Sequence, residues 1–131
     1  MSSSATGSFT VDSFEPVGAP DGGPGETVVS EALLAKTFTG DLDATSTVRM
    51  LAAQTPVEGS AVYVALERIT GSLHGRKGSF VLLHAATQQD ARWLIVDDSG
   101  TGELAGLTGT AVIGRHDDGS HTLTLDYDLP Q

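Results

Sequence analysis

The 131-residue sequence has no cysteine and few basic residues, and each shortage removes a class of function. Without cysteine there is no disulfide framework, no thiol nucleophile and no cysteine metal site. Only 7 lysines and arginines stand against 17 acidic residues, which gives a formal charge of -10. Nucleic acids and anionic membranes are bound through clustered basic side chains, so we expect neither as a partner. The acidic excess is typical of a solubilising surface.

Targeting signals and long apolar runs are missing as well. The first ten residues, MSSSATGSFT, have neither the basic nor the apolar region of a secretory signal, and no apolar run approaches transmembrane length. We therefore expect a cytoplasmic protein. Its organisation is predicted as a disordered N-terminal tail at residues 1–6 followed by one domain at residues 7–131, long enough to bury a core without metal or disulfide support.

The sequence is rich instead in glycine, threonine, valine and serine, and its 16 glycines mark frequent turns. Residues 31–36 (EALLAK) have helical propensity but are too few to form an isolated helix, and we interpret them as strand. Residues 16–25 (PVGAPDGGPG) predict an irregular loop. The chain then divides into about eight strands with short connections, the pattern of an all-β, antiparallel up-and-down barrel. A β-sandwich is the alternative.

Residues 61–86 (AVYVALERITGSLHGRKGSFVLLHAA) predict a hairpin that places an acid and an imidazole on one face. If its turn centres on Gly75 and Arg76, as a type II′ turn, Glu67 faces His84 directly. If the turn centres on His74 and Gly75, the register moves by two and the pair is diagonal on the same face. The other side chains of that face are mostly apolar. The sequence leaves open whether this face points inward.

Glu67 and His84 are the candidate catalytic residues. A neighbouring carboxylate favours the imidazolium while burial opposes both charges, so the protonation of the pair is expected near neutral pH. Such a pair can move a proton between two positions of a bound molecule, as isomerisation or cyclisation requires. A hydrogen-bonded structural pair is the alternative. The candidate ligand-binding residues are Tyr63, Phe80, Leu82, Trp93 and Tyr127.

Three further features were considered as sites. Lys36 lies in period with apolar neighbours, and we expect its amine to reach water. His116 and His121 face each other if the last hairpin turns at its Asp-Gly pair, but histidines at a turn tip are usually solvated, so we predict neither a metal nor another cofactor. The glycine-rich residues 99–109 lack the Gly-Lys-Ser/Thr ending of a phosphate loop, and they favour sharp bends of a closing sheet.

Several segments together resemble one family. They are KTFTGDL, VALERITGSLHGRKGSFVLLHA, SGTGELAGLTGTA and SHTLTLDYDL. They resemble DUF3224, a bacterial family of unknown function that is related to allene oxide cyclase and more distantly to dirigent proteins. The most specific parts are Leu-Glu-Arg at 66–68, Ser-Phe-Val-Leu at 79–82 and Gly-Thr-Gly-x-Leu at 100–104, the last being similar to a Gly-Thr-Gly-x-aromatic element of the cyclases and dirigent proteins.

The resemblance implies an eight-stranded antiparallel barrel, allene oxide cyclase-like and calycin-like, with a central cavity and frequent oligomers. Such relatives carry out or guide cofactor-free cyclisation and coupling of hydrophobic small molecules. The resemblance transfers no catalytic residue to this chain.

Three functions stay open at this point. The first is a barrel that binds a hydrophobic small molecule and acts on it as a cofactor-free isomerase or cyclase. The second is a non-catalytic carrier or sensor in the lipocalin manner, with Glu67 and His84 structural. The third is an interaction module, because residues 91–97 are apolar on both faces, as expected of a homo-oligomer, either a dimer or a trimer. The direction in which Glu67 and His84 point discriminates among them.

Overall fold

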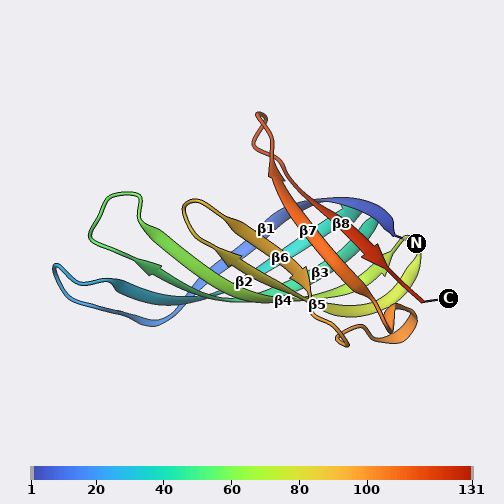
Figure 1. Ribbon diagram of the computed structural model, residues 1–131, viewed down its shortest axis with the longest axis horizontal. Helices are drawn as coiled ribbons and strands as arrows, with labels where there is room; N and C mark the ends of the chain where they lie inside the picture. Colours follow the sequence, from blue (N-terminus) through green and yellow to red (C-terminus); the bar gives the residue numbers. More distant parts are fainter. Residues whose placement is uncertain (1, 131) are drawn as a thin grey trace.

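The computed structural model describes residues 2–130, and it is a closed barrel of eight antiparallel strands in sequence order (Figure 1). The strands are Ser3–Asp21 (β1), Val28–Gly40 (β2), Leu42–Gln54 (β3), Ala61–Leu73 (β4), Arg76–Ala86 (β5), Ala91–Ile95 (β6), Thr108–Arg115 (β7) and His121–Asp128 (β8). Each strand pairs with its neighbours in sequence, and β1 pairs with β8 to close the barrel. The predicted all-β up-and-down barrel is therefore confirmed. Within residues 2–130, no helix has the length and apolar character needed to cross a membrane.

The core follows from alternation along the strands. In β8, Leu123, Leu125 and Tyr127 are buried while Asp126 is exposed, because successive side chains of a strand point to opposite faces. Inward side chains of all eight strands contribute to one apolar core cluster. This cluster fills the end of the barrel at which the two chain termini lie, and the β1–β2 and β3–β4 hairpins project from the other end (Figure 1).

The glycine-rich segment between β6 and β7 closes the filled end. It contains a short 3-10 helix, Gly102–Leu104 (η1), and places Leu104 and Leu107 in the core at 1% and 0% exposure. Gly102 has φ +59, and a Cβ there would lie 2.9 Å from a backbone oxygen of β5. Most of this segment is therefore a plug rather than a bend of the sheet. Within residues 99–109, Gly109 in β7 has φ of +149, a conformation that favours glycine.

β1 is longer at both ends than predicted. Residues 3–6, expected in a disordered tail, pair with β8, while Met1 lies outside the described residues. Residues 16–21, expected in the irregular loop, continue the strand and pair with β2. Beyond Phe9, β1 has a described partner on one side only. Pro16 lies on this free edge, where a strand tolerates a residue that lacks an N–H.

The β4–β5 hairpin adopts the second of the two predicted registers. His74 and Gly75 form its turn, with φ of 48 and 80, the two left-handed residues of a type I′ turn. Ala65, rather than Glu67, is the direct partner of His84. The direct pairing of the acid and the imidazole is therefore wrong, and the diagonal pairing on one face is correct.

The β7–β8 turn also differs from the prediction. Its loop has three residues rather than two, so Arg115 rather than His116 pairs with His121. Gly119, with φ +87, supplies the left-handed residue that ends such a loop. The His116 side chain lies 3.1 Å from the Thr122 hydroxyl, measured from Nε2 to Oγ1. The two histidines are consequently not opposed across the hairpin.

Candidate functional site

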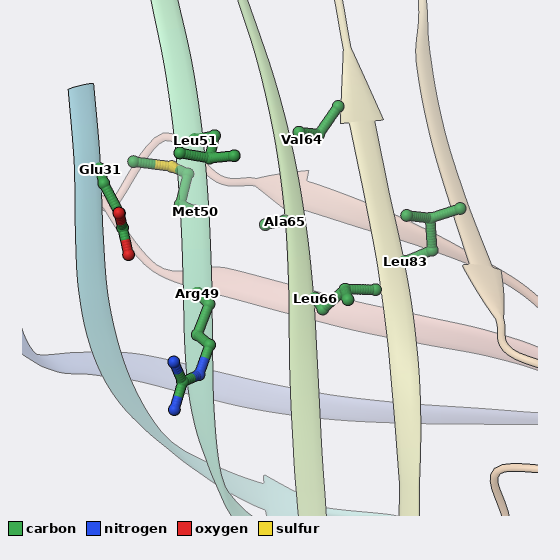
Figure 2. Close-up of a pocket in the computed structure, with 8 residues that line it drawn as sticks. All are labelled: Glu31, Arg49, Met50, Leu51, Val64, Ala65, Leu66 and Leu83. Carbon is green, nitrogen blue, oxygen red and sulfur yellow. The ribbon is translucent and has the colours of Figure 1, made fainter. Parts of the chain in front are cut away.

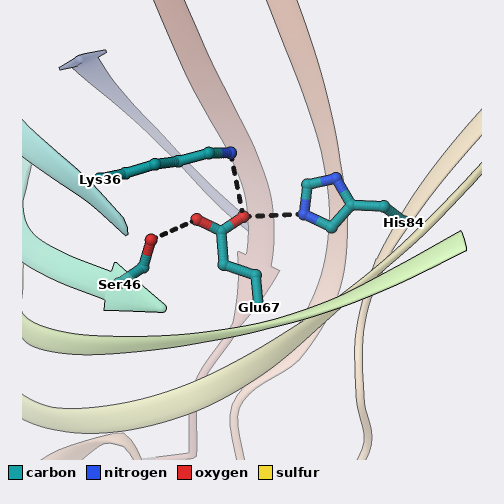
Figure 3. Close-up of polar contacts among 4 residues, drawn as sticks. All are labelled: Lys36, Ser46, Glu67 and His84. Carbon is teal, nitrogen blue, oxygen red and sulfur yellow. Dashed lines mark hydrogen bonds and ion pairs between the residues drawn. The ribbon is translucent and has the colours of Figure 1, made fainter. Parts of the chain in front are cut away.

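A polar cluster lies inside the barrel, contributed by four successive strands (Figure 3). It consists of Lys36 on β2, Ser46 on β3, Glu67 on β4 and His84 on β5. Their exposed fractions are 8%, 5%, 1% and 3% respectively. Each occupies an inward position in the alternation of its strand, and Lys36 and Ser46 are direct partners in the β2–β3 ladder. The face that carries Glu67 and His84 therefore points inward.

Glu67 is the centre of the cluster, and both of its carboxylate oxygens have partners (Figure 3). The Nε2 atom of His84 lies 2.7 Å from Oε1, and the Nζ atom of Lys36 lies 3.4 Å from the same oxygen. The Ser46 hydroxyl donates a hydrogen bond of 2.5 Å to Oε2. Buried charges persist when they are paired and hydrogen-bonded in this way.

The surroundings of Glu67 keep it ionised. Burial alone raises the pKa of Glu67, but the hydrogen bonds from His84 and Ser46 and the charge of Lys36 outweigh burial and lower the pKa below its ordinary value of 4.5. An ionised carboxylate only accepts hydrogen bonds, so Nε2 of His84 carries the proton in their bond. A neutral His84 then keeps its lone pair on Nδ1.

Lys36 does not reach water, and the prediction that it would is wrong. Its ammonium group lies between the Glu67 carboxylate and the ring of Phe9, whose centre is 4.7 Å from Nζ. An opposite charge and an aromatic face both compensate for lost hydration. The sequence did carry the signal, because Lys36 alternates in phase with Leu34 and Phe38, which both point inward.

Next to the cluster, at the end of the barrel away from the chain termini, is a cavity of about 420 Å³. Lys36 and His84 line it and are buried, so they form its floor. Arg115 lines it and is exposed, so it lies at the mouth. Apolar side chains from several strands form the walls. Glu67 does not line the cavity and lies behind the floor.

The predicted ligand-binding residues divide between cavity and core. Tyr63 and Trp93 line the cavity. Phe80, Leu82 and Tyr127 belong to the packed core, at 1%, 0% and 7% exposure, and do not line it. The face they share with the polar cluster was assigned correctly, but their depth along the barrel axis could not be read from alternation. Of the predicted ligand-binding residues, Tyr63 and Trp93 are therefore the ones placed to contact a molecule in the cavity.

Two residues of the site were missed by the sequence reasoning. Ser46 lies at an inward position of β3, yet its contact with Glu67 depends on the β3–β4 register, which no local pattern specifies. Arg115 follows Ala111 and Ile113 at inward positions of β7. That alternation was visible in the sequence, but an arginine at a strand end is ordinarily interpreted as a surface residue.

Trp93 occupies a weak seam of the barrel. β6 pairs with β7 through only two residue pairs, Trp93 with Ala111 and Leu94 with Thr110. The indole Nε1 of Trp93 is buried and has no hydrogen-bond partner within the described residues. Buried donors of this kind are rare, and this one is not exposed to any open space around the described residues.

Tyr127 takes part in a second polar contact at the opposite, filled end. Its hydroxyl lies 2.5 Å from Nδ1 of His74, and Nε2 of His74 lies 3.7 Å from Oδ2 of Asp41. These residues connect β8 to the turns that follow β2 and β4. The contact is remote from the cavity and fastens the filled end of the barrel.

The outer surface of β2–β5 carries a shallow apolar groove (Figure 2). Leu51, Val64 and Leu66 line it with 50%, 48% and 52% of their surface exposed. Glu31 and Arg49 lie at the same groove. Exposed apolar surface of this kind is common at sites of contact with other molecules, and it lies outside residues 91–97, on which the interaction-module hypothesis was based.

No metal centre is evident in the described part of the chain, because residues 2–130 contain no group of three or more His, Cys, Asp or Glu side chains placed to hold an ion. His121 instead stacks beside Phe9, with ring centres 5.4 Å apart.

The fold and the cluster define a small closed β-barrel with an internal cavity over a buried carboxylate. The chain belongs to the family described as "Protein of unknown function (DUF3224)", whose model matches residues 5–127. The crystal structure of a DUF3224 protein of unknown function from Shewanella oneidensis MR-1 is similar, with 38% identity, full coverage of both chains and a TM-score of 0.90. No curated protein matches this chain. The family predicted from sequence segments is thus confirmed, whereas the relation to allene oxide cyclase stays a resemblance.

Proposed function

We propose that the protein binds a hydrophobic small molecule in the cavity and moves a proton on it, as a cofactor-independent isomerase or cyclase. The observation that carries this proposal is that Lys36 and His84 both line the cavity and both contact the buried Glu67. A volume of about 420 Å³ falls among small-molecule sites, which commonly measure roughly 300–1,000 Å³. The allene oxide cyclase resemblance supports the same chemistry without supplying residues.

His84 is the residue that would transfer the proton. Its Nδ1 atom takes a proton from a carbon next to a carbonyl group of the bound molecule, and the C–H electron pair moves into an enolate. Glu67 stabilises the imidazolium that results and holds the ring in its tautomer, so it is a positioning residue. Where the enolate is conjugated with a carbon–carbon double bond, return of the same proton from Nδ1 to the γ-carbon shifts that double bond into conjugation with the carbonyl group and yields an isomer, with no atom gained or lost.

Lys36 would stabilise the negative charge that develops on the carbonyl oxygen. Its ammonium group is held at the cavity floor by Glu67 and by the Phe9 ring, so it needs little reorganisation when the charge appears. Burial strengthens this attraction, because the largely buried Lys36 is poorly hydrated. The three side chains thus divide the work into proton transfer, positioning and charge stabilisation.

Hydrogen exchange of a simple ketone tests this chemistry. We would follow the α-hydrogens of 2-decanone in D₂O by proton NMR, with and without the protein. The expected result is accelerated exchange that His84→Gln abolishes and that Lys36→Met slows by about tenfold or more. His116→Gln, at the exposed β7–β8 turn, is the matched control and should match the parent protein. Acceleration that survives His84→Gln would contradict the proposal.

A carrier or sensor is the alternative that uses the same cavity. Saturable binding of 2-decanone without any acceleration of exchange would favour it. Binding is followed by the fluorescence of Trp93, the only tryptophan of the chain. Ala65→Phe places a ring in the cavity and should block binding, whereas Val112→Phe, on the outside of β7 at 60% exposure, should not. Melting curves verify that both variants fold.

The apolar groove favours a second role, as the contact between two copies of this chain. The groove carries one acid, Glu31, and one base, Arg49, in a chain with a formal charge of -10. Two copies therefore meet there with less repulsion than at other surfaces. Native mass spectrometry of freshly purified protein should show a dimer and any co-purifying molecule. Leu66→Glu should give monomers and Val112→Glu should not; a monomeric parent protein would contradict this role.

A further inference from the structure

We infer that the ligand of the cavity carries a single carboxylate, held at the mouth by Arg115, with its apolar body along the walls. This inference rests on the proposed function, because it names the class of molecule that the same cavity takes. It depends on the charges of the lining and on the order of the side chains from mouth to floor.

Apart from the phenol of Tyr63, the ionisable side chains of the lining are all basic. Lys36, His84, Arg115 and His121 line the cavity, and none of the described lining residues is an aspartate or glutamate, although the chain has 17 of them. The charge of Lys36 is compensated by Glu67. Arg115 has no ion pair among residues 2–130, so it is the positive charge at the cavity that lacks a counter-charge. A carboxylate matches its planar pair of N–H donors.

The side chains between mouth and floor form a continuous row in space. Arg115 pairs with His121 across the β7–β8 ladder, and the His121 ring lies 5.4 Å from the Phe9 ring. The Phe9 ring in turn lies 4.7 Å from Nζ of Lys36. A molecule that spans this row of side chains places its charged end at Arg115, its apolar body against the rings, and its far end at the proton-transfer site.

Other ligand charges fit the mouth less well. A purely apolar ligand would leave Arg115 without a counter-charge, and a cation would meet Arg115 and Lys36 unfavourably. A carboxylate pairs with Arg115, and it does so against the overall negative charge of the protein. Trp93, the direct partner of His84 in the β5–β6 ladder, lines the wall and can report binding by its fluorescence.

Three probes of equal chain length test the inference: dodecanoate, dodecanol and dodecylamine. Each is titrated into the full chain below its aggregation concentration, with Trp93 fluorescence as the signal. We expect the Kd of dodecanoate to be lower than that of dodecanol by about fivefold or more, and the Kd of dodecylamine to be the highest of the three. Arg115→Gln should remove most of that preference and leave dodecanol binding unchanged. Arg92→Gln, at an exposed position of β6 that does not line the cavity, is the matched control.

The outcomes separate the inference from the proposed function. Equal binding of dodecanoate and dodecanol would overturn the carboxylate inference while leaving a functional cavity. The same holds if Arg115→Gln and Arg92→Gln reduce dodecanoate binding equally. A failure of all three probes to give a saturable signal would contradict the cavity function itself, and the inference with it. Higher salt should weaken dodecanoate binding selectively, because exposed charge pairs are screened.

Discussion

The Nε2 atom of His84 lies 2.7 Å from Oε1 of Glu67, and both side chains are almost completely buried. The two residues are diagonal neighbours on β4 and β5, brought together by the type I′ turn at the end of the hairpin. Lys36 shares the same carboxylate oxygen. This shared acceptor makes the stability of the barrel and the chemistry of its cavity depend on one carboxylate.

Removing the charge of Glu67 should destabilise the fold. Glu67→Gln leaves the buried ammonium of Lys36 without its counter-charge, and breaking one side of a buried pair costs about 3–5 kcal/mol of unfolding free energy. Urea denaturation measures the loss. In the double variant Lys36→Met/Glu67→Gln neither charge is present, so its loss should be smaller than the sum of the single losses. Strictly additive losses would contradict the coupling.

The lowered pKa of Glu67 predicts a loss of stability in acid. The folded pKa lies below the ordinary 4.5, so ionised Glu67 contributes stability that is fully present above about pH 4.5. That contribution disappears as the pH falls through the folded pKa. Urea denaturation of the parent protein and of Glu67→Gln should therefore give stabilities that differ most at pH 7 and converge on acidification. A difference independent of pH would contradict this interpretation.

The hydrogen bond between Tyr127 and His74 should contribute about 1 kcal/mol to stability. Tyr127→Phe removes the hydroxyl and leaves the ring in the core, so its melting temperature should fall. Tyr63→Phe is the matched control, because Tyr63 is partly buried and its hydroxyl has no hydrogen bond within residues 2–130. Equal changes in melting temperature for the two substitutions would show that the hydrogen bond of Tyr127 contributes nothing measurable to stability.

The plug at the filled end should be a major source of stability. Leu104→Ala creates a cavity next to the core and should cost about 2–5 kcal/mol in chemical denaturation. Val112→Ala shortens a side chain that is 60% exposed on the outside of β7, and we expect a change of about 0.5 kcal/mol or less. Comparable losses for the two substitutions would contradict the role of Leu104 as a plug.

The sequence predicted most of the barrel because alternation along a strand is a local signal. The inward direction of Leu123, Leu125 and Tyr127 was readable from β8 alone. The extension of β1 beyond residue 15 was not readable in this way. A sequence rich in proline and glycine looks the same whether it forms a loop or the free edge of a strand. The register of β4–β5 stayed open, since Gly75 fits either a type II′ or a type I′ turn.

The site was predicted only in part, for a different physical reason. Glu67 and His84 are close in one hairpin, so their pairing could be argued from the sequence. Lys36 and Ser46 join them through two further ladders, and the contacts depend on how three registers combine. Position along the barrel axis also decides which inward side chains meet the cavity. Phe80 and Trp93 share the inward face, and only Trp93 reaches the open part.

The pairing of β1 with β8 also bears on how quickly this protein acquires its structure. All other ladders join strands that are adjacent in sequence, whereas Ser3 pairs with Tyr127 near the opposite end of the chain. Joining such distant segments has a larger entropic cost than closing a short hairpin. We therefore expect seven neighbouring pairings to form early and barrel closure to be the slow step of refolding. Until that step, the edges of β1 and β8 are exposed to other chains, so refolding yield should fall as protein concentration rises.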